Sequence, residues 1–372
     1  MRPAATRPWL IAACALALAT PAAAQDRLLL RGGGVRTGPR VAFNEDGVTL
    51  GGEFVGWEEI RAATLAAEQD RFDQMLATLG EPLFQIRRRL EQENYAEIAE
   101  PAEAVLSRFA QRRSATAYMV FQGLMRARLA SNQTELALEP YFLCLDCLRD
   151  LKKNLKQPKP AKWQMQLNTD SGLAKELIPV WFDAKSAKAA WPRVRKAIDG
   201  LEKPIPPGVY VYAATLALAA GEAVAADELL KQTPKTEAAV NDLLQVVEAQ
   251  REVQAGKPGP ALDALEKQID RYRDPVKAVA YYWLGLGLIA SADTQKKKAG
   301  VLQLLHVPAL YRDSEELAAA SLYHAVKTLE TLQDLRSGAV GEELFSTYPG
   351  SQHAAKRKAE IQAGKKDATM PP

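Results

Sequence analysis

The sequence predicts a mostly helical protein in which helix hairpins stack side by side as an α-solenoid, preceded by a small β element. Three observations lead to this fold class. Alanine and leucine dominate while aromatic residues make up only 7% of the 372 residues, which favours helices. Turn-forming residues recur at intervals just under forty residues in the second half of the chain. Glycine-rich breaks separate short β-prone runs before residue 60.

Residues 1–24 carry the features of a secretory signal peptide. Arg2 and Arg7 provide the positive region, Trp9–Ala19 is an apolar run, and three alanines precede Gln25. We therefore expect a secreted or periplasmic protein. This apolar run is too short to span a membrane, which takes about 20 residues. An alternative is lipoprotein processing at Cys14, in "IAAC", but it would leave the apolar "ALALATPAAA" on the mature chain.

The charge balance argues against wholesale binding of nucleic acid. Removal of Arg2 and Arg7 lowers the formal net charge from +3 to +1. Basic clusters remain at 152–162, 296–298 and 356–358. They are explained by solvated helix faces and loops, or alternatively by contact with an anionic polymer or membrane surface. No later apolar stretch reaches 18 residues, so we expect no membrane span in the mature chain.

The small β element is predicted over residues 25–60. Asp46-Gly47 lies between the β-prone runs 41–43 and 48–50, which is a strong hairpin signal. Further glycines punctuate the segment, and three or four short strands are expected. The pattern resembles the small SH3/Sm-like barrels at the front of some secreted bacterial proteins.

A first helical region of helix hairpins is predicted over 61–153. A connection follows over 154–205, where Pro158, Pro160 and Pro179 forbid a long helix until about Ala184. Expected helices in the first region cover 61–79, 82–93, 94–110, 113–131 and 133–153. Residues 363–372 are expected to be a disordered tail.

Four similar joints divide the last part of the chain. They lie at 232–234, 272–274, 311–313 and 348–350, with spacings of 40, 39 and 37 residues. Each is followed by capping residues and good helix formers, so each ends one helix hairpin and begins the next. Small residues twelve apart mark where paired helices touch. These helix-packing positions are Ala249 with Ala261, and Ala325 with Ser337 and the following Pro349.

This pattern resembles the tetratricopeptide-repeat (TPR)-like proteins of the bacterial cell envelope. The last unit, "ELFSTYPGSQHAAKRKAE", is similar to the closing repeat of the Tol–Pal coordinator and of the Bam-complex repeat lipoprotein. The resemblance covers roughly 206–362 and, more loosely, 95–153. It implies a right-handed superhelix with a concave groove, and no catalytic residues in the repeats.

Few residues have the spacing that catalysis needs. Cys144 and Cys147 form a CxxC inside a predicted helix, so two buried free thiols, a disulfide, or a redox pair remain open, in that order. His306, His324 and His353 lack metal-ligand spacing, and no phosphate loop or nucleophile elbow is present. We expect no enzyme, no cofactor and no metal.

Aromatic residues are the better candidates for a binding site. Five of them lie on first helices of predicted pairs: Tyr210, Tyr212, Tyr281, Tyr282 and Trp283. They either fill the seam between helices or line a groove that grips a peptide. Trp163 and Trp181, in the irregular segment 154–182, either anchor this long loop or form a second candidate patch.

The leading functional hypothesis is a non-enzymatic scaffold of the cell envelope that binds another envelope protein or a peptide segment. The alternative is a module that binds cell wall or polysaccharide through basic loops and tryptophans. A thiol-redox protein that uses the CxxC pair is the third hypothesis. The sequence leaves the partner and the oligomeric state open.

Overall fold

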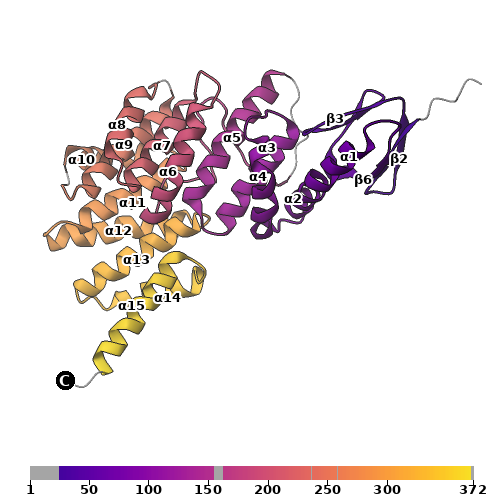
Figure 1. The fold of residues 1–372 in the computed structure, drawn as a ribbon. Coiled ribbons are helices and arrows are strands. Elements are labelled where there is room, and N and C mark those ends of the chain that lie inside the picture. The colour runs from indigo at the N-terminus through magenta and orange to yellow at the C-terminus, as the bar shows by residue number, and fades with distance from the viewer. Residues whose placement is uncertain (1–24, 155–161, 236, 258, 370–372) are drawn as a thin grey trace, which may run out of the picture. The chain divides into compact units, whose positions relative to one another are not determined.

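The computed structural model describes residues 25–154, 162–235, 237–257 and 259–369 (Figure 1). The protein is mostly helical, with a small antiparallel sheet region near its N-terminal end. The chain divides into two compact units after Gly80. The predicted signal peptide and Cys14 lie outside the described residues.

The first unit contains two antiparallel sheets of three strands each. One has the order β2-β1-β6 and the other β3-β4-β5. The strands are β1 (Asp26–Leu30), β2 (Val35–Gly38), β3 (Val41–Asn44), β4 (Gly47–Leu50), β5 (Glu53–Val55) and β6 (Ile60–Thr64). The predicted hairpin is confirmed, because Asn44 pairs with Gly47 across a two-residue turn.

An aromatic cluster forms the core of this unit. Trp57 is fully buried, and its ring lies 5.1 Å from Phe72 and 6.1 Å from Phe43 between centroids. The Trp57 Nε1–H donates to the carbonyl of Asn44 at 2.7 Å, which satisfies the buried donor. Phe72 comes from α1 (Gln69–Met75), which continues as the π-helical turn η2 (Leu76–Gly80).

The sequence placed the end of the β element too early. A helix was expected from residue 61, whereas β6 runs from Ile60 to Thr64 and pairs with β1. Ile60 is fully buried, and pairing with the edge of β1 outweighs the helix preference of Ala62 and Ala63. The buried carboxylate of Asp26 also fixes this region, since it accepts from Val41 N at 2.6 Å and Ala66 N at 2.7 Å.

The second unit begins with the helices predicted before residue 154. They are α2 (Glu81–Glu91), η3 (Tyr95–Ile98), α3 (Ala99–Phe109), α4 (Ala115–Ala130) and α5 (Thr134–Lys153). Ser114 caps α4 by accepting from Ala117 N at 3.1 Å. A Cβ on Gly123 would lie 2.9 Å from Ile86, so α4 approaches α2 closely at this position.

Residues 162–183 are irregular, as the prolines predicted. We call them the central segment. An isolated bridge joins Leu167 and Ala174. Asn168 Oδ1 accepts from the backbone N–H groups of Asp170 and Ser171, both at 3.0 Å. The chain then enters α6 (Ala184–Asp199), close to the predicted position, with Asp183 as its cap.

All four predicted joints fall between two helices, which confirms them as helix boundaries. The first helices of successive pairs, α7, α9, α11, α13 and α15, also contact one another in order. The helices are α7 (Pro207–Ala219), α8 (Ala223–Gln232), α9 (Ala238–Gln254), α10 (Pro260–Gln268) with η4 (Ile269–Arg271), α11 (Val276–Ile289), α12 (Thr294–Leu310), α13 (Glu315–Thr331), α14 (Arg336–Thr347) and α15 (Gln352–Thr369).

The predicted small residues occupy different environments. Ala249 and Ala325 are fully buried, Ala261 and Ser337 are half-buried, and Pro349 is exposed in the turn before α15. The tightest approach of α11 and α12 is instead at two glycines. A Cβ would lie 2.6 Å from Leu304 at Gly285 and 2.7 Å from Ile289 at Gly300.

Two further features concern the C-terminal helix. α15 runs to Thr369, so the expected tail is helical where it is described, because Ala- and Lys-rich sequence continues a helix well.

The start of α15 contacts the α4–α5 turn. Asn132 Nδ2 donates to the carbonyl of Gly350 at 3.3 Å, and Gln352 Nε2 donates to the carbonyl of Asn132 at 3.3 Å.

Candidate functional site

The central segment covers the aromatic residues that were candidates for a peptide groove. Tyr212 is 1% exposed; its hydroxyl donates to the carbonyl of Leu177 at 2.7 Å and accepts from Ala174 N at 3.2 Å. Burial raises the pKa of Tyr212. Tyr282 packs edge-on against Phe182, with ring centroids 6.0 Å apart. These two tyrosines therefore bind the chain's own residues.

The remaining candidates of this set are also withdrawn from solvent. Tyr281 and Trp283 are each 7% exposed, and Tyr210 is half-buried. Tyr281 stacks on His306 with centroids 4.7 Å apart. The geometry favours the interpretation of these rings as core, and a contact with an external peptide stays a prediction.

Polar contacts fix the central segment between helices. Glu135 on α5 accepts from the backbone N–H of Phe182 and of Asp183 through Oε1, both at 3.1 Å. Trp181 Nε1 donates to Thr215 Oγ1 on α7 at 3.0 Å. Burial raises the pKa of Glu135, because the charged form loses solvation. Trp163 is half-buried, and its carbonyl accepts from Arg126 Nε at 3.2 Å.

Cys144 and Cys147 are free and buried on α5. Burial raises the pKa of both thiols, in the case of Cys147 to about 12. Cys147 Sγ donates to the carbonyl of Ser114 at 3.1 Å. Burial therefore disfavours the thiolate form, which is the nucleophile in thiol exchange.

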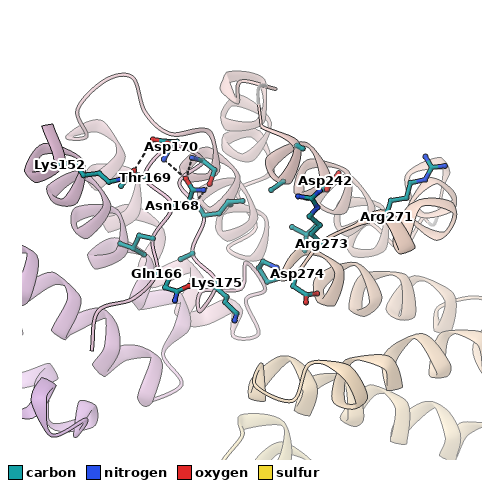
Figure 2. A pocket seen from close by; sticks show the side chains of 18 residues that line it. Lys152, Gln166, Asn168, Thr169, Asp170, Lys175, Asp242, Arg271, Arg273 and Asp274 are labelled. Atoms are coloured by element: carbon teal, nitrogen blue, oxygen red, sulfur yellow. Dashed lines mark hydrogen bonds between the residues drawn. The ribbon is translucent and has the colours of Figure 1, made fainter. Parts of the chain in front are cut away.

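A cleft of about 830 Å³ opens between the central segment and the starts of α9 and α11. Figure 2 shows charged side chains from both walls, with Asp170 and Lys175 on the central segment and Asp242, Arg273 and Asp274 opposite. Lys152 on α5 donates to Thr169 Oγ1 at 2.7 Å at one end of this cleft. The charged residues that line the cleft are Lys152, Lys175, Arg271, Arg273, Asp170, Asp242 and Asp274.

Two further clefts continue along the central segment. The second, of about 630 Å³, shares Lys175 and Asp274 with the first and adds Arg312 and Asp313. The third, of about 210 Å³, shares Asp313 with the second and reaches the start of α13. We call this row of three clefts the joint groove, because it passes the predicted joints at 272–274 and 311–313.

The tyrosines of two joints contact residues that precede them in the chain. The Tyr311 hydroxyl hydrogen-bonds to Asp274, and burial together with this carboxylate raises the pKa of Tyr311. Tyr272 donates to Gln245 Oε1 at 2.6 Å, and burial followed by the nearby Asp242 raises its pKa to about 12. Tyr311 therefore links the joint at 311–313 to the joint at 272–274, whereas Tyr272 fixes its joint to α9.

The charge of the joint groove changes along its length. Four cations and three carboxylates line the first cleft, whereas four carboxylates and no cation are among the described residues that line the third. Burial raises the pKa of Asp242, and the Arg273 guanidinium opposes that shift. Such a surface is able to pair with charged and hydrogen-bonding groups on a bound chain.

The sequence carries a signal for this groove in its repeated joints, although the joints by themselves predict helix boundaries and not a binding surface. The repeated Tyr-Arg-Asp triplets at 272–274 and 311–313 supply both charges of each joint. No local sequence pattern identifies Lys175 and Glu176 of the central segment as part of a binding surface. Only the fold brings them opposite the joints.

Two of the three histidines lie near each other in the helical unit. His324 and His353 have ring centroids 6.4 Å apart, and His353 Nδ1 lies 3.8 Å from Glu316 Oε2. Burial, then His353 and Lys356, lowers the pKa of His324 to about 4. Within the described parts of the chain, no group of three or more His, Cys, Asp and Glu residues is arranged to hold a metal ion.

The structure also bears on membrane association. Over the residues that the structure describes, no helix combines the length and the apolar character required to cross a bilayer.

No protein-family model matches the chain, and no curated protein or solved structure matches it. The resemblance to tetratricopeptide-like envelope proteins is therefore still a prediction from the residues.

Proposed function

We propose that the protein is a secreted or periplasmic scaffold, without catalytic activity, that binds an extended segment of another envelope protein in the joint groove. One observation carries the proposal. Three adjoining clefts run along the central segment, and the repeated Arg-Asp joints line them. Secretion is inferred from the signal-like residues 1–24.

The arrangement of helices supports a TPR-like α-solenoid as the scaffold. Successive first helices contact one another, and the joints between pairs recur at 40, 39 and 37 residues. In such an array each pair buries its apolar face against its neighbours, and the aligned joints become a long surface. A surface of this kind suits an extended partner better than a compact one.

The chemistry of the groove supports a polypeptide partner. Arg273 and Arg312 are exposed, and a guanidinium is able to donate to the carboxylates and carbonyls of a bound chain. Asp274 and Asp313 are exposed as well and are able to accept from its donors. One cation and one carboxylate at each joint match the alternating donors and acceptors of an extended chain.

The cell-wall alternative receives less support. Sugar-binding surfaces often use exposed aromatic rings, but Trp181, Trp191 and Trp283 are buried and Trp163 is half-buried. The basic cluster at 152–162 falls largely outside the described residues.

Site-specific photo-cross-linking in the native envelope tests this proposal. Ala239 and Ala309 are exposed, uncharged residues that line the first and second clefts, so each is replaced by a photoreactive residue. Leu302, an exposed residue of α12 outside the groove, is the control position. The same protein should cross-link at both groove positions and not at residue 302.

A charge variant strengthens the test. Arg273→Gln with Arg312→Gln should lower the cross-linking yield about threefold or more, since each surface charge pair contributes about 0.2–1 kcal/mol. Lys296→Gln with Lys298→Gln removes the same charge elsewhere and should leave the yield unchanged. Cross-links that form only at residue 302, or none at all, would contradict the proposal.

A further inference from the structure

The third cleft combines an apolar floor with a carboxylate rim. It lies where the central segment passes the α4–α5 turn and the start of α13. The floor consists of Leu129, Leu177, Ile178, Val180, Phe182 and Leu317. The carboxylates are Glu176, Asp313, Glu315 and Glu316.

These carboxylates are not all explained by the helix they adjoin. Glu315 and Glu316 lie in the first turn of α13, where the helix dipole favours negative charge. Glu176 belongs to the central segment, and Asp313 precedes the helix, so both add charge that the first turn does not require. Among the described residues that line the cleft, none is Lys, Arg or His.

One carboxylate oxygen also lacks a donor. Glu316 Oε1 accepts from Gln352 N at 3.3 Å, whereas its buried Oε2 has no hydrogen-bond partner among the described residues. His353 Nδ1 lies 3.8 Å from this oxygen. This oxygen is closed to solvent and faces His353 Nδ1, which also has no hydrogen-bond partner among the described residues. The carboxylates that a bound cation can reach are therefore the exposed Glu176, Asp313 and Glu315.

We propose, building on the function proposed above, that this cleft takes a lysine or arginine side chain of the bound segment. Its methylene stem lies on the apolar floor and its charged head lies among the exposed carboxylates. The first cleft, with four cations against three carboxylates, then faces the acidic part of the same segment. The bound chain consequently has a fixed polarity, with its basic residue at α13.

The size of the cleft agrees with a single side chain. Its volume of about 210 Å³ is below the roughly 300–1,000 Å³ of pockets that enclose a whole small ligand. An amine with a short apolar body is therefore a suitable probe, and n-butylammonium carries both features. Butan-1-ol has the same apolar body without the charge and serves as the neutral control.

The direct experiment titrates n-butylammonium and butan-1-ol into the full chain while backbone amide NMR signals of Ile178 and Leu317 are recorded. n-Butylammonium should shift both signals in a saturable way, and butan-1-ol should not. Asp313→Asn with Glu315→Gln should weaken this binding about fivefold to tenfold, since two of the exposed carboxylates are lost. Glu228→Gln with Glu266→Gln, which neutralises two exposed carboxylates elsewhere, should bind n-butylammonium as the natural chain does.

Equal binding of the two probes, or equal weakening in both double variants, would overturn the proposal. The cleft variant should melt at the same temperature as the natural chain, because both substituted side chains are exposed. This thermal melting serves as the control that the variant is folded.

Cross-linking at Ala239 separates failure of this proposal from failure of the proposed function. If the partner cross-links equally well in the Asp313→Asn, Glu315→Gln background, the polarity proposal is wrong and the proposed function stands. If no partner cross-links in any background, the proposed function is wrong. A lysine or arginine side chain of a bound segment is then also wrong as the occupant of the third cleft.

Discussion

The β unit and the helical unit of this protein build their cores in different ways. In the β unit, a strand, a turn and a helix each contribute one ring to the cluster of Phe43, Trp57 and Phe72. In the helical unit, buried residues from Val180 to Ala354 contribute to one extended apolar core, in which Ala249 and Ala325 are fully buried. Damage to one side chain should therefore spread through the β unit but stay near its own pair in the helical unit.

The largest effect is expected from Trp57→Ala. It leaves a cavity among the three rings and removes the hydrogen bond to Asn44, so the free energy of unfolding of the β unit should fall by about 3–5 kcal/mol. Hydrogen exchange of the β1–β6 amides measures the loss. Exchange that accelerates in only one of the two sheets would contradict a shared aromatic core.

A smaller and more local effect is expected from Ala325→Trp. Ala325 is fully buried on α13, so overpacking should lower the free energy of unfolding by about 1–3 kcal/mol or more. Ala261→Trp is the matched control, because this half-buried residue leaves room for the ring to turn outward. Thermal melting compares them, and an equal loss in both variants would show that burial does not set the cost.

The two units should also differ in their response to pH. The pKa of His324 is lowered to about 4 in the folded protein, below its usual value of 6.5, so the unfolded chain binds the proton first. The free energy of unfolding of the helical unit should fall by about 1–3 kcal/mol between pH 6.5 and 4. His324→Gln should remove this part of the pH dependence in denaturant titrations. The β unit contains no histidine and should lack it.

The smallest effect is expected from Thr215→Val, which leaves the buried Trp181 Nε1–H without its acceptor. The free energy of unfolding should fall by about 1 kcal/mol. The central segment should open locally more often, because this hydrogen bond connects it to α7. Hydrogen exchange of its backbone amides should therefore become faster, while the β unit is unaffected. An unchanged exchange rate for the amides of residues 177–182 would contradict this role.

Local signals in the sequence predicted the local features of the fold. Asp46-Gly47 identified its hairpin, and the Tyr-Arg-Asp triplets identified helix boundaries, because turns and caps depend on neighbouring residues. β6 was missed, since its stability comes from pairing with β1 more than thirty residues earlier.

The candidate site depended on contacts that no local pattern reveals. The rings of Tyr212 and Tyr282 were identified as candidates, but their occupant, the central segment, is a Pro-containing stretch without periodicity. Glu176 reaches the joint groove only because that segment lies against the starts of α11 and α13. Charge complementarity between distant segments becomes visible only when the fold is known.

The contact between Asn132 and the start of α15 has a consequence for how this architecture evolves. Open repeat arrays gain or lose units freely, because each unit touches only its neighbours. Here residues 218 and 220 positions apart are hydrogen-bonded, and Phe182 packs against His353 near the same place. A duplicated hairpin inserted between α7 and α15 would pull these partners apart. The contact therefore constrains the number of hairpins that this part of the chain can contain.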